Sequence, residues 1–196
     1  MPTRCYVTEK HTAMSVEETI IEIKKELRAN MNGVASARMR EGGLDYHVNF
    51  GIDLPRLQEI AGQFTPSHEL AQQLWHENVR ESKILAGLLM PVERFWPDVA
   101  DIWVEQMPNA EIAQLTVMNL FARLPYASDK AFEWMGHADE MFQLCGFLLI
   151  TRLLMQGAVL TDRSRDEVLD QASSLLDTPN LHLRKAVQNV IARLKN

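Results

Sequence analysis

Residues 110–150, AEIAQLTVMNLFARLPYASDKAFEWMGHADEMFQLCGFLLI, contain two amphipathic helical segments with a shorter one between them. Their apolar residues recur at the three- and four-residue spacing of one helix face. We expect helices over about 109–123, 128–137 and 139–156, with Pro108 separating the first from the helix before it. An alternation of shorter and longer helices with short turns between them is typical of helical hairpins stacked side by side.

The same arrangement extends to both sides of this stretch. The expected pairs are 67–77 with 78–90, 95–107 with 109–123, 128–137 with 139–156, and 164–177 with 180–195. In the second helices, Glu81, Gln114, Gln143 and Arg184 correspond, with steps of 33, 29 and 41 residues. Such steps suit repeats of the HEAT class. The sequence therefore predicts an all-α fold, an α-α superhelix (solenoid) of HEAT-like helical-hairpin repeats, with an up-and-down helical bundle as the alternative.

The N-terminal region completes this domain with less regular helices. Ser15 begins S-V-E-E, a capping-box pattern that predicts a helix ending before Asn32-Gly33. A short helix is expected over 34–40, and another begins near Pro55. Residues 15–196 are thus expected to form a single domain. Residues 1–14 lack the apolar core of a signal peptide and are expected to be a disordered leader, with Met1 or Met14 as the true start.

Composition agrees with a globular domain, with 46% hydrophobic and 23% charged residues. No apolar run reaches the roughly 18 residues that a membrane span needs, so no membrane association is expected. The two cysteines, Cys5 and Cys145, lie in a polar tail and an apolar helix, which argues against a disulfide and favours the cytoplasm. Cys145 is expected to be a buried structural thiol.

Charge is distributed unevenly along the chain, whose formal net charge is −6. Residues 95–150 carry two Lys or Arg against eight Asp or Glu. A groove that binds DNA phosphates should concentrate Lys and Arg, because the release of counterions drives that binding. The acidic central block therefore argues against strong DNA binding unless its acids face away from the binding surface.

Three features together resemble the DNA alkylation repair family, the bacterial alkylpurine DNA glycosylases built from HEAT-like repeats (AlkD type). The first is NFGIDLPRLQEIA at 49–61, similar to the family's aromatic-Gly loop and the helix after it. The second is LWHENVRESKILA at 74–86, similar to a short outer helix followed by an inner helix with a glutamate. The third is the number and spacing of the later pairs. The resemblance covers about residues 15–195.

The resemblance implies an aspartate and a tryptophan on one inner helix and an arginine on the next. A carboxylate there would stabilise the positive charge that develops as the glycosidic bond breaks. Here the matching positions hold Asn119 and Gln143, and residues 112–128 contain no Asp or Glu. Asparagine cannot balance that charge, and losing such a group costs on the order of 10²–10³ in rate. The resemblance therefore indicates a divergent member that lacks the usual catalytic residues.

Other residues could supply chemistry or binding. Glu81 is the candidate for a relocated acid, ahead of Asp45 and Asp53, because Lys83 lies close to it in the sequence. The second helices of the pairs should line the concave face of a solenoid, where partners dock. A binding face there would include Arg80, Lys83, Arg123 and Arg184, beside Asn119 and Gln143.

Metal and cofactor sites are not expected. None of the six histidines pairs with another His, Cys or acid at metal-ligand spacing, and no phosphate-binding glycine motif is present. The four tryptophans, Trp75, Trp96, Trp103 and Trp134, fall on the first helices of the pairs, where packing between repeats is expected.

Three functions remain open from the sequence. The first is a divergent family member that binds duplex DNA or another partner without catalysis. The second is a protein-interaction scaffold with no nucleic-acid role. The third is an active alkylpurine DNA glycosylase with a relocated acid, so the sequence leaves enzymatic activity undecided.

Overall fold

The computed structural model describes residues 14–44 and 46–195, which fold into a row of helices without a strand. The expected leader therefore falls outside these residues except for Met14. The α-helices are α1 (Val16–Ala29), α2 (Gly33–Glu41), α3 (Leu54–Ala61), α4 (His68–His76), α5 (Arg80–Leu89), α6 (Pro97–Glu105), α7 (Ala110–Asn119), α8 (Ala127–Met135), α9 (Glu140–Met155), α10 (Asp162–Ser174) and α11 (Leu181–Lys195). Two short 3-10 turns, η1 (Val92–Arg94) and η2 (Phe121–Arg123), connect them.

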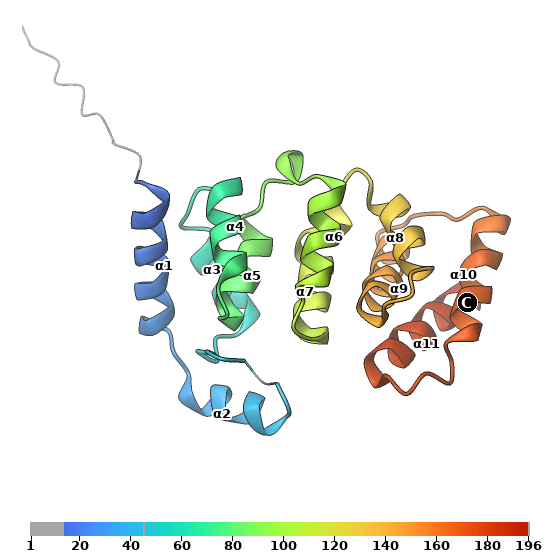
Figure 1. The fold of residues 1–196 in the computed structure, drawn as a ribbon, viewed down its shortest axis with the longest axis horizontal. Helices are drawn as coiled ribbons and strands as arrows, with labels where there is room; N and C mark the ends of the chain where they lie inside the picture. Colours follow the sequence, from blue (N-terminus) through green and yellow to red (C-terminus); the bar gives the residue numbers. More distant parts are fainter. Residues whose placement is uncertain (1–13, 45, 196) are drawn as a thin grey trace, which may run out of the picture.

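Apart from α2, the helices stack in sequence order from α1 to α11 (Figure 1). The first helix of a pair packs on the second in α4–α5, α8–α9 and α10–α11. The second helices also pack on one another, in the order α5, α7, α9 and α11, with α3 against α5. We call α5, α7, α9 and α11 the inner row. This arrangement confirms the predicted all-α solenoid of HEAT-like hairpins.

Aromatic rings join successive hairpins within the core. Trp75 of α4 and Trp103 of α6 stack with ring centroids 4.0 Å apart and planes 3° from parallel. Phe95 and Phe121 continue this column toward Trp134 of α8. The expected packing of tryptophan between repeats is thus confirmed for Trp75, Trp103 and Trp134, which are buried.

Trp96 departs from that expectation. It precedes α6 as its N-cap residue, and 66% of its surface is exposed. Because Pro97 fixes the first turn of α6, Trp96 adopts an extended backbone outside the helix and its ring does not enter the core.

Local signals set most helix ends. Ser15 and Glu18 form the expected capping box of α1. The helix expected over 109–123 instead stops at Asn119 and continues as η2, because Leu120 leaves the helical backbone region. Pro125 holds Leu124 in an extended conformation, which prevents the helix from resuming there.

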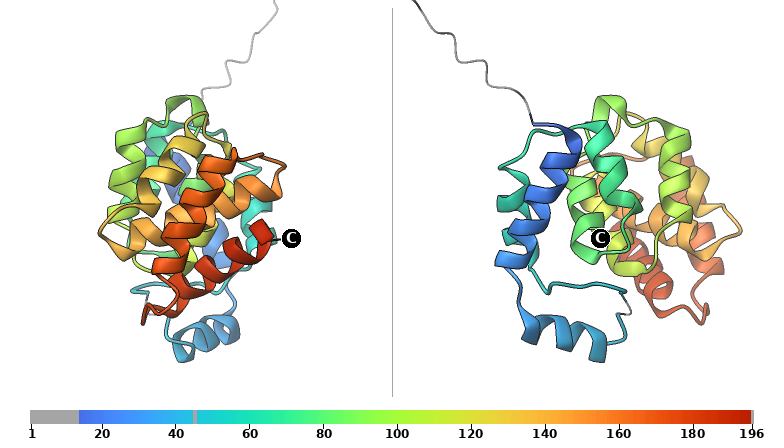
Figure 2. Two further views of the ribbon diagram at one scale, coloured as in Figure 1. Left: turned by 90° about the vertical axis from the view of Figure 1, so that its right-hand side faces the viewer. Right: turned by 60° about the vertical axis from the view of Figure 1, so that its left-hand side comes forward.

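The α2 helix stands apart from the row. Figure 1 shows it below the stack, beyond the lower end of α1, and the end-on view in Figure 2 shows the same projection. Ser36 is its one buried residue. The segment 46–53 leads into α3 and carries the contacts that hold α2 in place, which are described below.

Two further observations concern the apolar character of the helices and the one cysteine among the described residues. Among the described residues, no helix is long and apolar enough to cross a membrane. Cys145 is fully buried with a free thiol, as expected, and burial raises its pKa well above the ordinary value.

Candidate nucleic-acid interface

A shallow trough crosses the inner row between α7, α9 and α11. Two adjoining pockets form it, of about 160 Å³ between α7 and α9 and about 530 Å³ between α9 and α11, and they share Thr151 and Met155. The trough is lined by Gln114, Val117, Met118, Leu148, Thr151, Arg152, Met155, Asn189, Ala192 and Arg193. This lining contains two arginines and no Asp or Glu.

The two arginines occupy corresponding places in successive repeats. Arg152 lies on α9 and Arg193 on α11, 41 residues apart, which is the step from Gln143 to Arg184. Arg152 Nε is buried and has no hydrogen-bond partner within the described chain. The residue as a whole is half-buried and forms no ion pair within the described residues, so its guanidinium is not neutralised by a carboxylate of the protein.

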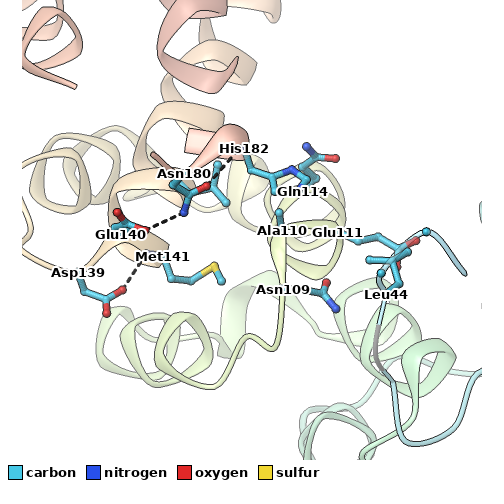
Figure 3. A pocket seen from close by; sticks show the side chains of 13 residues that line it. Leu44, Asn109, Ala110, Glu111, Gln114, Asp139, Glu140, Met141, Asn180 and His182 are labelled. Carbon is cyan, nitrogen blue, oxygen red and sulfur yellow. Dashed lines mark hydrogen bonds between the residues drawn. The ribbon is translucent and has the colours of Figure 1, made fainter. Parts of the chain in front are cut away.

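A larger pocket of about 670 Å³ adjoins the trough at Gln114, which lines both (Figure 3). Its walls are the first turns of α7, α9 and α11 and the Gly42–Leu44 segment after α2. Glu111, Asp139 and Glu140 line it, without any Lys or Arg. We call it the acidic pocket. Asp139 caps α9, and Glu140 accepts a hydrogen bond from Asn180 at 2.8 Å.

Asn119 and Gln143, the positions matched to the family's acid and arginine, do not face one another across this trough. Asn119 ends α7, and its Nδ2 is buried without a hydrogen-bond partner among the residues seen in the structure. Gln143 donates from Nε2 to the carbonyl oxygen of His137 at 2.8 Å and so closes the turn between α8 and α9. Neither residue lines the trough, whereas Arg152 does.

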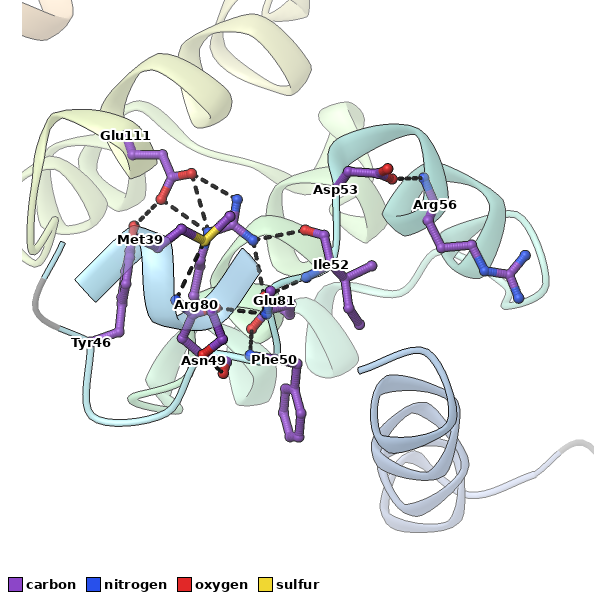
Figure 4. Close-up of polar contacts among 12 residues, drawn as sticks. Met39, Tyr46, Asn49, Phe50, Ile52, Asp53, Arg56, Arg80, Glu81 and Glu111 are labelled. Carbon is purple, nitrogen blue, oxygen red and sulfur yellow. Dashed lines mark hydrogen bonds and ion pairs between the residues drawn. The ribbon is translucent and has the colours of Figure 1, made fainter. Parts of the chain in front are cut away.

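Arg80 and Glu81 are buried, with 4% and 0% of their surfaces exposed. Glu81 accepts backbone N–H groups of the 46–53 segment, from Phe50 at 3.0 Å, Gly51 at 3.1 Å and Ile52 at 3.3 Å (Figure 4). Arg80 Nη1 donates to Glu81 and to the Ile52 carbonyl oxygen, both at 2.9 Å. Glu81 therefore holds a loop in place and is covered from any substrate, so the structure does not offer it as a catalytic acid.

The same network reaches α7 through Glu111. Arg80 contacts both carboxylate oxygens of Glu111 at 2.7–3.1 Å, and Tyr46 Oη lies 2.5 Å from Glu111 Oε2. Burial opposes the charge on Glu111, but hydrogen bonds from Arg80 and Tyr46 outweigh it and lower the pKa of this carboxyl. Burial and the neighbouring Glu111 raise the pKa of Tyr46. The network fixes the 46–53 segment, and with it α2, to the inner row.

The prediction that Arg80, Lys83, Arg123 and Arg184 form an exposed basic face is therefore wrong for the first two of these residues. Arg80 belongs to the buried network, and Lys83, 9% exposed, donates to the Trp75 carbonyl oxygen at 2.7 Å and lies over the Trp75 ring. Burial lowers the pKa of Lys83. Both lie on the side of α5 that packs against its neighbours. Arg123 is exposed after α7, and Arg184 is half-buried on α11.

Sequence reasoning missed Arg152 and Arg193 because it followed the family's expected positions. The repeat step of 41 residues was the signal that could have found them, since it carries Arg152 onto Arg193. Over the parts of the chain described, no three His, Cys, Asp or Glu side chains gather as metal ligands do.

These features define a HEAT-like repeat protein whose inner row presents a polar trough with two arginines. Residues 23–194 match the family model described as DNA alkylation repair enzyme, and the chain belongs to that family.

Comparison with solved structures gives the same fold. One similar structure is described as "A new family of proteins related to the HEAT-like repeat DNA glycosylases with affinity for branched DNA structures". Its TM-score is 0.80 at 16% identity, and the match covers 89% of this chain and 74% of that one. No curated protein sequence matches this chain.

Proposed function

We propose that this protein binds DNA through the trough of the inner row and does so without excising bases. The observation that carries the proposal is the lining of the trough, where Arg152 and Arg193 stand beside apolar and amide side chains and no carboxylate is present. Guanidinium groups pair with phosphate oxygens, and the absence of nearby acids leaves that attraction unopposed.

The acidic centre of the chain does not contradict this proposal. Of the eight acids between 95 and 150, none lines the trough. Glu111 is paired with Arg80, and Asp101 with Lys130. These carboxylates are held away from the trough arginines, so the local charge of the trough differs in sign from that of the whole central block.

Base excision is disfavoured by the same lining. An alkylpurine glycosylase of this family needs a carboxylate close to the sugar, to stabilise the charge that develops there. Asn119 occupies the matched position, and Glu81 is covered. We therefore propose a divergent member that lacks the usual aspartate and arginine and retains binding.

Branched DNA is the form of DNA to test first. The structural neighbour is described as one of a family of proteins with affinity for branched DNA structures. Base pairs whose stacking is interrupted at a branch point would lie on the apolar part of the trough, where Met118, Leu148 and Met155 are partly exposed.

The proposal is tested by fluorescence anisotropy with labelled linear duplex and four-way junction DNA at low salt. Arg152→Glu/Arg193→Glu should weaken binding to both DNAs by roughly 100-fold, since two attractive contacts become repulsive. The control Lys25→Glu/Arg163→Glu changes charge equally at two exposed sites outside the trough, and it should stay within about 3-fold of wild type.

Two other results would redirect the account. Wild-type protein that binds neither DNA at low salt would favour the protein-interaction scaffold. Release of 7-methylguanine or 3-methyladenine from alkylated duplex by the wild type, and its loss in Asn119→Ala, would indicate an active glycosylase instead.

A further inference from the structure

The α2 helix is unusual in this fold because no other helix packs extensively against it. It forms none of the larger helix–helix contacts that join the other α-helices. Six of its nine residues are exposed, and its buried contact is made by Ser36. Isolated helices this short are marginal in water, so α2 must be stabilised by its attachment.

That attachment is rigid. Asn32 N donates to the Phe50 carbonyl oxygen at 2.8 Å, and Ser36 Oγ donates to the Asn49 carbonyl oxygen at 2.8 Å. Gly51, at φ +72°, lies so close to α2 that an added Cβ would meet Asn32 O at 2.3 Å. The loop that receives α2 is itself fixed by the Glu81 and Glu111 network. The helix is therefore held as a fixed projection.

The projection carries positive charge. α2 carries two arginines, Arg38 and Arg40, against one acid, its last residue Glu41, and Arg28 lies in the last turn of α1 before it. The three arginine side chains are exposed, and none takes part in an ion pair within the described residues. A surface of unpaired arginines on an exposed helix is complementary to a phosphodiester backbone.

The acidic pocket lies between this projection and the trough. Its lining runs from Gly42–Leu44, directly after α2, to Gln114, which also belongs to the trough. Asp139 and Glu140 would repel a backbone laid across this gap, since neither is paired with a Lys or Arg among the described residues, whereas Glu111 is paired with Arg80. One straight duplex in contact with both cationic surfaces would have to cross these acids, whereas two arms that diverge from a branch could avoid them.

We propose that α2 binds a second duplex arm of branched DNA through Arg38 and Arg40, while the trough holds the first arm. This inference rests on the proposed DNA binding. It adds a structural reason why the protein should bind branched DNA more tightly than linear duplex. The acidic pocket would face the open centre of the junction, where the backbone charge is more distant.

The test compares a four-way junction with a linear duplex of the same arm sequence, using the full chain. Wild type should bind the junction at least tenfold more tightly than the duplex. Arg38→Glu/Arg40→Glu should reduce that ratio to about one and leave duplex affinity within about twofold, because the trough is intact. Lys25→Glu/Arg163→Glu should keep the wild-type ratio.

Each outcome separates the two proposals. Equal wild-type affinity for the two DNAs, or an equal loss on both in Arg38→Glu/Arg40→Glu, would overturn the role of α2 and leave trough binding standing. Absence of binding to either DNA would overturn the proposed function itself. Circular dichroism and thermal unfolding of Arg38→Glu/Arg40→Glu show whether the variant is folded like wild type. Arg38→Gln/Arg40→Gln removes the positive charges without reversing them, and it should lower the ratio of junction to duplex affinity by less.

Discussion

Glu81 shows how a residue's neighbours decide its role. In the sequence it is an acid at the start of an inner helix near Lys83, which is a reasonable setting for chemistry. In the fold its two carboxylate oxygens accept three backbone N–H groups and Arg80. A carboxylate with four donors around it and no exposed surface is a structural anchor.

Removing that anchor should destabilise the protein strongly. Glu81→Ala would leave the buried N–H groups of Phe50 and Ile52 without an acceptor and remove one partner of Arg80, which keeps Glu111 and the Ile52 carbonyl oxygen. Each buried polar group left unsatisfied costs about 1–3 kcal/mol. Urea unfolding followed by circular dichroism measures the change. Glu105→Ala, at an exposed position of α6, serves as the control and should change the free energy of unfolding by about 0.5 kcal/mol or less. A small effect of Glu81→Ala would contradict the anchoring role.

Glu111 should make stability depend on pH on the acid side. Its folded pKa is lowered, so the unfolded chain takes up this proton first, near pH 4.3. The stability that the group contributes is present above that pH and is lost as the pH falls further.

Glu111→Gln should remove this dependence. The free energy of unfolding should be lower than wild type at pH 7 and should approach the wild-type value near pH 3, as measured by urea titrations at both pH values. Glu167→Gln, an exposed glutamate of α10, should follow the wild-type curve. A constant difference between Glu111→Gln and wild type would show that the Arg80–Glu111 pair is not the titrating contact.

At the scale of elements, two glycines on inner-row helices have opposite surroundings. A Cβ on Gly146 of α9 would lie 2.5 Å from Met135 N and 2.9 Å from Ala131 O, so this glycine permits the close approach of α8 and α9. A Cβ on Gly87 of α5 would meet nothing within 4 Å.

These surroundings predict opposite effects of the same substitution. Gly146→Ala should lower stability by about 1–3 kcal/mol through overpacking against the α8 backbone. Gly87→Ala should raise stability by about 0.5–1 kcal/mol, because alanine favours the helix over glycine. Thermal unfolding of both variants checks this, and effects of the same sign would contradict the packing between α8 and α9.

The elements themselves were largely predictable from local sequence. Capping at Ser15, Pro55 at the start of α3 and the apolar period of the second helices act within a few residues, so their effects can be read from the sequence. The contacts of the candidate site were harder to predict from the sequence. The Arg80–Glu111 contact joins residues 31 apart, and Tyr46 reaches Glu111 across 65. Nothing local shows that Arg80 turns inward, since a basic residue on an amphipathic helix is usually solvated.

For the molecule as a whole, the sign of the charge changes from one part of the inner row to the next. The first turns of α7, α9 and α11 border the acidic pocket, while the later turns of α9 and α11 supply Arg152 and Arg193 to the trough. The net charge of −6 averages over this pattern and gives no indication of it. A solenoid can present such separate surfaces because each repeat adds its own short strip of side chains to a continuous face.

The most direct test of DNA binding through the trough is the salt dependence of affinity for four-way junction DNA. The measurement compares wild type with Arg152→Ala/Arg193→Ala between about 50 and 200 mM salt. Each phosphate neutralised contributes about 0.9 to the slope of log affinity against log salt, so the double variant should have a slope smaller by about 2. Lys25→Ala/Arg163→Ala should keep the wild-type slope. An unchanged slope in Arg152→Ala/Arg193→Ala would mean that DNA does not contact these arginines and would contradict the account.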